Sequence, residues 1–392
     1  MSVIELGEWG ADFTANPYPY YAKLRESGPV HYVRMPDGWE FWLVVGHEEG
    51  RAALADPHLV KSPSLIGVTP LDEEIIGPNL LGVDPPDHTR LRKLVAREFT
   101  GRRVEALRPR VQELADELAD AMEPAGRADL VDAFAFPLPI TVICELLGVP
   151  AADRDSFRRW SNQVVAPTDE ASGRQAVEGL GAYLDALIED KRAARPTDDL
   201  LSALITTRAE DGDRLSLPEL RAMGYLLLVA GHETTVGLIS NTIRALLAHP
   251  DQLADLRADF GLLDGAVEEG LRYDGPVETS TFRLAKEPTV IGDTPIPAHA
   301  NVFVSLAAGD RDPQRFPEPD RFDIRREPRG HLAFGHGIHY CLGAPLARLE
   351  GAIAIRTLLE RFPRLELDPD GAPWEWMPGL LVRGVRRLPV RW

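Results

Sequence analysis

Cys341 lies in the segment that most clearly predicts chemistry. It follows the run Phe334-Gly335-His336-Gly337-Ile338-His339-Tyr340 and stands just before an apolar run with helical spacing, Leu346 to Leu359. A cysteine at a helix N-terminus has its thiolate stabilised by the helix dipole and by backbone N–H groups, which lowers its pKa and makes it a ligand or a nucleophile. The other cysteine, Cys144, lies in the apolar run 141–147, so we expect an inert core residue.

Two kinds of chemistry fit a thiolate at Cys341. His339 is close in sequence and could act as the general base of a cysteine protease, which would also need an oxyanion hole. That interpretation leaves the long helix described next unexplained. Ligation of a metal by a single thiolate instead indicates an iron whose other positions belong to a porphyrin.

A second unusual segment, Ala230-Gly231-His232-Glu233-Thr234-Thr235, lies in the middle of a long predicted helix. This helix begins at the capping box of Ser216 and Glu219, ends before Pro250, and spans about 30 residues or about 45 Å. A mid-helix glycine costs about 1 kcal/mol relative to alanine, and a buried acid is costly unless it is hydrogen-bonded or faces a cavity. The segment predicts either a helix crossing with a satisfied acid or a ligand site. A zinc-protease motif is excluded, because Val236 stands where the second histidine is required.

The spacing of three motifs adds to these observations. Phe334, Gly337, Cys341 and Gly343 match the pattern FxxGxxxCxG, the run Glu269-Gly270-Leu271-Arg272 matches ExxR, and residues 230–234 match an oxygen-activating helix motif. The three motifs follow one another along the chain as the helix motif, ExxR and the cysteine loop. By this order and over essentially its whole length, the chain resembles the cytochrome P450 family. Segments 84–95 and 335–349 look like the macrolide-hydroxylating branch of its soluble actinobacterial members. The resemblance implies the cytochrome P450 fold, mainly α with a minor β region, as a single catalytic domain over residues 1–392.

The resemblance also implies roles for individual residues. Cys341 would be the axial thiolate of haem b, Thr234 would donate a hydrogen bond to dioxygen, and Glu233 would supply protons to it. A structural charge network supporting the haem loop would comprise Glu269, Arg272 and Arg321. The other haem contacts would be His88, Arg92, Arg283 and His339 at the propionates, and Phe334, Gly335, Gly343, Ala230 and Gly231. The substrate contacts would be Leu81, Val229, Ala230, Val277, Thr279 and Leu381.

An acidic run, Asp72-Glu73-Glu74, lies in the first loop that the family resemblance places at the substrate pocket. It is either a solvated cluster of loop acids or a receptor for an amino sugar. The related macrolide enzymes often carry an acid just before the Asp-Pro-Pro segment, where this chain has Leu81-Gly82-Val83. That departure argues against a substrate with a basic sugar.

The elements that must position these residues are predicted to be mainly helices. Apolar residues at helical spacing predict helices over Val104–Met122 and Leu180–Lys191, in addition to the long one. Strand-like segments are few, and they are Val30–Val33, Phe41–Val45, Val290–Ile291 and Val302–Leu306.

The composition limits the classes of partner. The 392 residues carry 43 Lys and Arg against 61 Asp and Glu, a net charge of −18, which excludes wholesale binding to nucleic acid or to an anionic membrane. Two cysteines build no disulfide framework, and the N-terminus lacks the features of a signal peptide. We therefore expect a cytoplasmic monomer with no nucleic-acid or membrane partner.

One stretch departs from this acidic balance. Residues 90–110 carry eight basic residues against two acidic ones, and the stretch is either a solvated face or a docking surface for an acidic ferredoxin. The resemblance favours docking, with electrons passing from NAD(P)H through a ferredoxin reductase and a ferredoxin.

Together these features predict a haem-thiolate monooxygenase that hydroxylates an unactivated C–H bond of a bulky apolar natural product, a macrolide or polyketide of secondary metabolism. A steroid, secosteroid or fatty-acid hydroxylase is the alternative within the same class. A haem-binding sensor without turnover is the alternative from another class, and the intact Glu233-Thr234 pair argues against it, because a binding module needs no proton relay.

Overall fold

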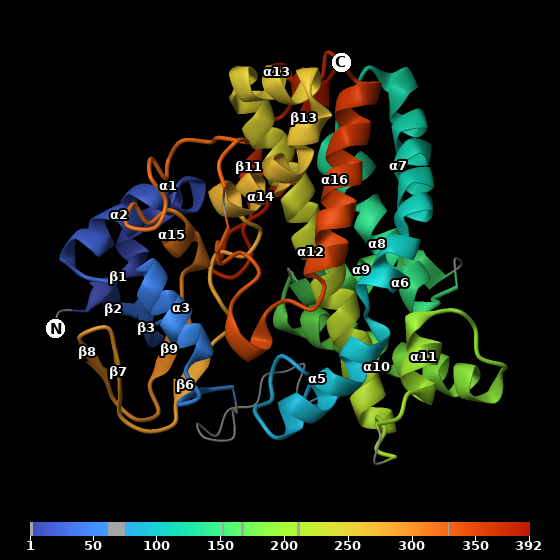
Figure 1. Cartoon of the computed structure of the whole chain (residues 1–392), viewed down its shortest axis with the longest axis horizontal. Coiled ribbons are helices and arrows are strands. Elements are labelled where there is room, and N and C mark those ends of the chain that lie inside the picture. The colour runs from blue at the N-terminus through green and yellow to red at the C-terminus, as the bar shows by residue number, and fades with distance from the viewer. Residues whose placement is uncertain (1–2, 62–74, 151–152, 166–167, 210–211, 328) are drawn as a thin grey trace. The chain divides into compact units, whose positions relative to one another are not determined.

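The chain forms two compact units, each assembled from segments that are distant in the sequence. Figure 1 shows the computed structural model, which describes residues 3–61, 75–150, 153–165, 168–209, 212–327 and 329–392. Unit 1 contains Met1–Val60, Gln112–Phe136 and Thr234–Trp392. Unit 2 contains Lys61–Val111 and Pro137–Glu233. Most of the described elements are helices, as the sequence predicts.

A six-stranded sheet organises the N-terminal part of unit 1. Its strand order is β1 (Ile4–Glu5), β2 (Val30–Arg34), β3 (Glu40–Val44), β9 (Asn301–Val304), β6 (Arg283–Ala285) and β4 (Leu59–Val60). The antiparallel pair β2 and β3 is in register at Val30 and Val44, and β3 runs parallel to β9 with Trp42 opposite Val302. The chain thus brings its beginning and the region around residue 300 into one sheet, visible in Figure 1 as the blue and orange strands.

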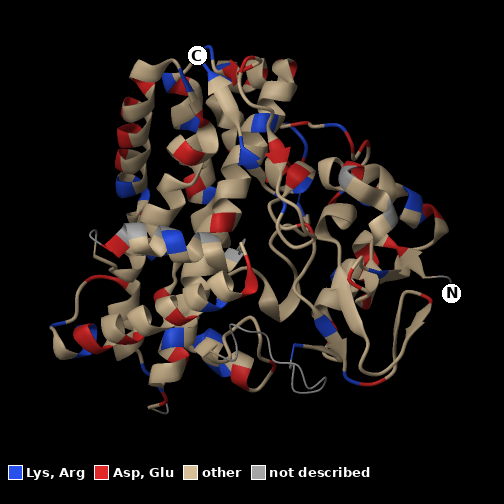
Figure 2. Cartoon of the chain, turned by 180° about the vertical axis from the view of Figure 1, so that it is seen from behind, with Lys and Arg blue, Asp and Glu red and all other residues tan. Residues whose placement is uncertain are grey.

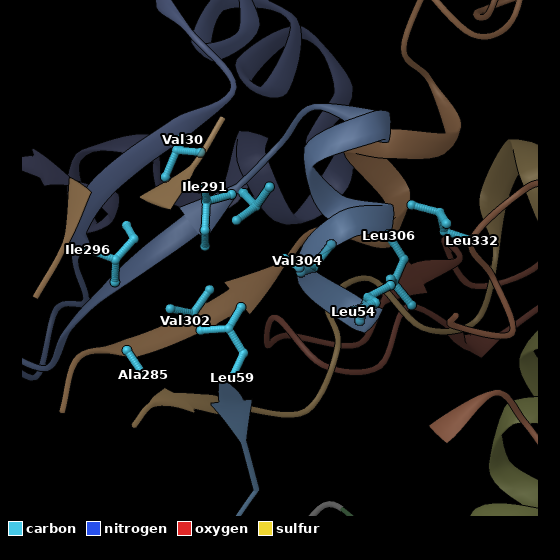
Figure 3. Packing of buried hydrophobic residues seen from close by; sticks show 12 residues of the cluster. Val30, Leu54, Leu59, Ala285, Ile291, Ile296, Val302, Val304, Leu306 and Leu332 are labelled. Carbon is cyan, nitrogen blue, oxygen red and sulfur yellow. The ribbon is translucent and has the colours of Figure 1, made fainter. Parts of the chain in front are cut away.

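One face of this sheet is covered by helix α3 (His47–Ala55) and forms an apolar core. Figure 3 shows Val302 and Val304 of β9 beside Leu54 of α3 and Leu59 of β4. Leu332, from the loop that leads to the cysteine, belongs to the same cluster. The core therefore ties the start of the cysteine loop to the sheet.

The remaining elements of unit 1 are helices and small sheets. Besides α3, the α-helices that lie wholly in this unit are α1 (Gly10–Ala15), α2 (Tyr18–Ser27), α13 (Pro250–Ala258), α14 (Leu263–Asp274), α15 (Leu306–Asp310) and α16 (Ala344–Arg361). The small sheets pair β10 (Glu366–Leu367), β13 (Pro389–Arg391) and β5 (Arg127–Asp129), then β11 (Glu375–Trp376) with β12 (Val385–Arg387), and β7 (Thr289–Ile291) with β8 (Thr294–Ile296).

Unit 2 is built from helices. They are α5 (Asp87–Glu98), α6 (Gly101–Ala106), α8 (Pro137–Leu147), α9 (Arg154–Val165), α10 (Glu170–Ala193) and α11 (Leu200–Thr206). Helices α9 and α10 pack through aromatic rings, with Phe157 and Trp160 at 4.9 and 5.9 Å from the Tyr183 ring. Gly179 makes this packing close, since a Cβ there would lie 2.8 Å from the Trp160 indole nitrogen.

Helix α12 (Leu217–Ala248) is the long helix that the sequence predicts, 32 residues or about 48 Å. The capping box is confirmed: the backbone N–H and the hydroxyl of Ser216 donate to the Glu219 carboxylate at 2.7 and 2.8 Å. Among the described residues only α12 is long and apolar enough to cross a membrane, and 61% of its most apolar window is buried in the structure.

The helix predicted over Val104–Met122 is divided at Leu107 into α6 and α7 (Arg108–Met122). Four of the apolar residues whose helical spacing predicted this helix are buried, namely Val104, Val111, Leu114 and Met122. Acidic residues recur along the other side of α7, as Figure 2 shows. The predicted strands and the helix within α10 are also confirmed, except that Val45 lies just after β3, Ser305 lies just after β9 and Leu306 begins α15.

Candidate functional site

The cysteine loop in unit 1 presents the Cys341 side chain to solvent. The Cys341 N–H donates to the Phe334 carbonyl at 2.9 Å, and the Gly335 N–H donates to the Leu332 carbonyl at 2.7 Å. Helix α16 begins at Ala344, just after the cysteine, as the sequence predicts, so the sulfur lies beside a helix N-terminus. That position stabilises the thiolate form of the side chain.

Two glycines give this loop its shape. Gly335 and Gly337 have φ angles of 71° and 76°, a region that favours glycine. A Cβ at Gly337 would also lie 2.8 Å from the Leu54 carbonyl oxygen of α3. Gly343 differs, because a Cβ there would lie 3.8 Å from the Cys341 sulfur, which is ordinary contact. The protein itself therefore leaves space beside the sulfur at Gly343.

A carboxylate that the sequence analysis missed anchors the same loop. Glu268 of α14 accepts hydrogen bonds from Arg348 of α16 at 2.9 Å and from His331 at 3.1 Å. Burial alone would raise the pKa of Glu268, but the bonds from His331 and Arg348 lower it to about 2. The Arg348 guanidinium also lies over the Phe334 ring, 4.5 Å from its centroid. Glu268 thus connects two helices to the loop, and only its position beside the ExxR motif could have drawn attention to it.

The predicted network of Glu269 and Arg272 is present and fully buried. Arg272 donates to both carboxylate oxygens of Glu269, at 2.7 and 2.8 Å, with neither side chain exposed. The remaining donors of Arg272 bond to the carbonyls of Asp310 and Pro319 at 2.9 and 2.8 Å. The pair therefore holds the segment that precedes the cysteine loop.

The prediction that the Arg321 side chain joins this charge network was wrong. Arg272 contacts the Arg321 backbone carbonyl at 3.2 Å, whereas the Arg321 guanidinium is exposed and pairs with Glu318 at 3.5 Å. Arg326 takes the expected place, with its Nε 3.4 Å from Glu269 and its other nitrogens bonded to loop carbonyls. The turn of residues 317–326 points the side chain of Arg326 inward and that of Arg321 outward.

The other predicted haem contacts of unit 1 are Arg283 and His339, and the predicted catalytic residue Thr234 also belongs to this unit. Arg283, on β6, is only 4% exposed and donates to the Leu59 carbonyl at 3.3 Å. His339 ends a short 3-10 turn, Gly337–His339, within the cysteine loop. Thr234 is half-buried on α12.

The predicted haem contacts of unit 2 lie on α5 and α12. His88 is 2% exposed, and burial together with the charge of Arg92 lowers its pKa, against the opposing effect of Asp84. Arg92 lies one helical turn further along α5. These two residues share a helix face, as their spacing predicts.

The middle of α12 has one face that protein side chains do not cover. Ala230 is exposed, although Leu228 is 2% exposed and His232 is completely buried. Gly231 faces α8, because a Cβ there would lie 3.0 Å from Ile143, so the glycine serves a helix crossing. Glu233 is largely buried, and burial raises the pKa of its carboxyl. Both interpretations of this segment thus apply, the crossing to Gly231 and the open face to Ala230.

Three of the six predicted substrate contacts, Val277, Thr279 and Leu381, belong to one paired structure in unit 1. Val277 bridges to Val382, and the Glu278 N–H donates to the Leu381 carbonyl at 2.9 Å. The hydroxyl of Thr279, which is 1% exposed, donates to the Leu380 carbonyl at 2.7 Å. In unit 2, Leu81 and Val229 are half-buried. The acidic run Asp72-Glu73-Glu74 lies outside the described residues.

Much of the predicted basic stretch is paired with acids of unit 2. Arg90 pairs with Asp213 at 3.1 Å and with Glu219, and Arg110 pairs with Glu145 at 3.0 Å. Lys93 and Arg102 of the same stretch are exposed. The excess of positive charge read from residues 90–110 is therefore smaller in the folded unit than in the sequence.

These residues fit a thiolate-bound haem. In unit 1 the exposed Cys341 lies on a loop where Gly343 leaves room beside the sulfur, and the buried Arg283 suits a carboxylate partner. In unit 2, taken by itself, the buried His88 suits the same kind of partner. Also in unit 2, the exposed Ala230 leaves a helix face of the kind that a flat ring could approach.

Comparisons with known proteins agree with this fit. The family model for cytochrome P450 matches residues 140–388. Cytochrome P450 monooxygenase PikC of Streptomyces venezuelae is 57% identical, over 100% of this chain and 94% of its own length. The 6-deoxyerythronolide B hydroxylase of Saccharopolyspora erythraea is 46% identical, over 97% and 96%. The solved structure of ligand-free P450 monooxygenase TamI superposes with a TM-score of 0.90 at 44% identity, covering 100% of this chain and 94% of that one. The chain therefore belongs to the cytochrome P450 family and is one of its monooxygenases.

Proposed function

We propose that the protein hydroxylates an unactivated C–H bond of a bulky apolar natural product, a macrolide or polyketide, in secondary metabolism. The observation that carries this proposal is the exposed Cys341 sulfur on a glycine-shaped loop before α16. The macrolide class is supported by similarity to the 6-deoxyerythronolide B hydroxylase over nearly the whole of both chains. When bound, haem b supplies the oxidising chemistry that inserts one atom of dioxygen into the C–H bond.

Cys341 would hold the haem iron through its thiolate. Following the family pattern, Arg283 and His339, with His88 and Arg92, would bond to the haem propionates. Charge-assisted hydrogen bonds of this kind are about twice as strong as neutral ones. The Glu269 and Arg272 pair would act indirectly, by holding the segment that carries the loop.

Glu233 and Thr234 would form the proton relay to dioxygen. Burial raises the pKa of Glu233, which allows its carboxyl to hold a proton closer to neutral pH than an exposed glutamate does. Its 15% exposed side chain can pass that proton to water. The Thr234 hydroxyl would orient dioxygen by donating a hydrogen bond. A binding module without turnover has no use for these two groups.

Electrons would reach the protein from NAD(P)H through a ferredoxin reductase and a ferredoxin. A cavity of about 340 Å³ beside the cysteine loop is lined by Phe334 and Tyr340 and carries Arg51, Arg329 and Arg348. Only Glu268 opposes these charges among its lining residues. Cationic groups beside an aromatic patch suit an acidic partner, which electrostatic attraction would bring to this side.

The test is a substrate panel on the purified haem-loaded protein. Macrolides with and without an amino sugar, a secosteroid and a long fatty acid are compared by the low-to-high-spin shift of the ferric haem. Product is then identified by mass spectrometry with isotopically labelled dioxygen. Hydroxylation of a macrolide alone supports the proposal, whereas product only from the secosteroid or the fatty acid overturns the substrate class.

A cysteine variant tests the site itself. Cys341→Ser is expected to lose the thiolate absorption of the reduced carbonyl complex, while Cys144→Ala, which changes the buried cysteine of α8, retains it. Survival of that absorption in Cys341→Ser would refute the ligand assignment.

A further inference from the structure

His232 is a buried histidine that the proposed function does not use. It is 0% exposed on α12, next to Glu233. Its Nδ1 lies 2.8 Å from the Leu228 carbonyl oxygen of the same helix, and its Nε2 lies 2.9 Å from the hydroxyl of Ser161, on α9. Ser161 is itself only 4% exposed, so this contact between α9 and α12 is shielded from water.

The partners of His232 determine where its proton lies. A carbonyl oxygen can only accept, so Nδ1 must carry the hydrogen that bonds to Leu228. Burial lowers the pKa of the His232 imidazole to about 4, although the bond to Leu228 opposes the effect, and the ring is therefore neutral near pH 7. A neutral ring with its proton on Nδ1 presents Nε2 as an acceptor. The Ser161 hydroxyl consequently donates to His232.

Glu233 is the competing donor for the same nitrogen. Its Oε2 lies 3.6 Å from His232 Nε2, just beyond hydrogen-bond distance. Burial raises the pKa of Glu233 and so favours the protonated carboxyl, which is a donor. A Glu233 carboxyl that donates a hydrogen bond to Nε2 would be fixed beside the imidazole. A carboxyl without that bond stays available to exchange its proton with water.

We propose that Ser161 is a positioning residue for Glu233: by donating to His232 Nε2 it keeps the Glu233 carboxyl from bonding to the imidazole. The proposal rests on the assignment of Glu233 as the proton source. Because Ser161 lies on α9 and Glu233 on α12, the proton source is free only while α9 lies against α12. A displacement of α9 removes the hydroxyl, and the carboxyl then closes the short remaining distance to Nε2.

The physical basis is the cost of leaving a buried acceptor unsatisfied, about 1–3 kcal/mol. Without the serine hydroxyl, His232 Nε2 would bear that cost unless another donor reached it. The Glu233 carboxyl is the neighbouring donor, with its Oε2 3.6 Å from His232 Nε2. The helix backbone beside His232 has little room to move, because Gly231 packs against Ile143 of α8.

The test compares four variants of the haem-loaded protein. Ser161→Ala removes the hydroxyl and Ser161→Thr retains one. Ser156→Ala makes the same change on α9 at a residue whose hydroxyl accepts a hydrogen bond from the nearby Arg159. The double variant Ser161→Ala with His232→Leu removes donor and acceptor together, and this leaves no nitrogen to capture Glu233. It also replaces the threonine variant should the added methyl group fail to fit.

Two readouts are used, and the first needs no turnover. The infrared carbonyl stretch of protonated Glu233, identified by its disappearance in Glu233→Gln, is recorded in the resting ferric protein across a pH titration that brings this carboxyl into its protonated form. Ser161→Ala is expected to shift this band to lower wavenumber, as a new hydrogen bond forms. Ser156→Ala, Ser161→Thr and the double variant keep the wild-type position. An unchanged band in Ser161→Ala overturns the proposal.

The second readout is coupling, the fraction of consumed electrons recovered in hydroxylated product. Ser161→Ala is expected to lower it several-fold at unchanged substrate affinity, and Ser161→Thr to restore it. Coupling that falls equally in Ser156→Ala would contradict a specific role for Ser161. If no substrate is turned over, the proposed function fails, while the infrared measurement still decides the position of Glu233.

Discussion

Replacing Glu268 by glutamine should destabilise the folded protein in a way that depends on pH. The pKa of Glu268 falls from an ordinary 4.5 to about 2 in the folded protein, because the hydrogen bonds from His331 and Arg348 outweigh burial. At about 1.4 kcal/mol for each tenfold change in proton affinity, this difference corresponds to about 3 kcal/mol. Glu268 and Arg348 are 26% and 36% exposed, and solvent screening reduces the expected loss to about 1–2 kcal/mol.

The sign follows from the direction of the change. A carboxyl with a lowered folded pKa contributes stability above about pH 4.5, and it loses that contribution as the pH falls toward 2. Denaturant unfolding followed by circular dichroism should therefore show a larger difference between wild type and Glu268→Gln at pH 7 than at pH 4. The matched control is Glu360→Gln, which breaks the exposed pair with Arg356 and should cost under about 0.5 kcal/mol. A difference that grows at pH 4, or equal losses in both variants, would refute the reasoning.

Four further predictions concern other parts of the chain. Arg272→Lys should cost about 2–3 kcal/mol and reduce the haem content of the purified protein, because lysine cannot bond to both Glu269 oxygens; full haem content at wild-type stability would contradict this. Ser216→Ala should lower the free energy of unfolding by about 1 kcal/mol through loss of the α12 cap, as measured by denaturant titration, and no change would argue against the cap. Thr234→Ala should leave haem and substrate binding intact while less of the electron flow ends in product, and unchanged product per electron would exclude its part in the proton relay. Gly337→Ala should lower the yield of haem-loaded protein, since a Cβ would lie 2.8 Å from the Leu54 oxygen, and a normal yield would show that the loop can move aside.

The sequence predicted elements best where the cause is local. Ser216 and Glu219 are three residues apart, and both the capping box and the start of α12 follow from that spacing alone. The same holds for the cysteine loop, where the glycines and the following apolar run lie within one segment. The break at Leu107 was missed, because the apolar spacing continues across it while the backbone does not.

Contacts between distant segments were harder to predict. Arg321 and Arg326 are both plausible partners for Glu269 in sequence, and only the path of the turn decides that Arg326 points inward. The partners of Glu268 lie in a loop and on α16, far from it in the sequence, so no local sequence pattern predicts them. The excess of positive charge in residues 90–110 was overestimated for the same reason, because Asp213 and Glu145 pair with its arginines only in the folded unit.

The pairing of residues 277–279 with residues 380–382 limits how the protein can be redesigned. A substitution that removes the Thr279 hydroxyl breaks its hydrogen bond to the Leu380 carbonyl, next to Leu381, because the two segments share a bridge and two hydrogen bonds. Contacting residues of this kind give non-additive effects when they are changed together. Libraries that vary one segment while the other stays fixed would sample only distorted versions of the parent, so the two segments are best randomised jointly.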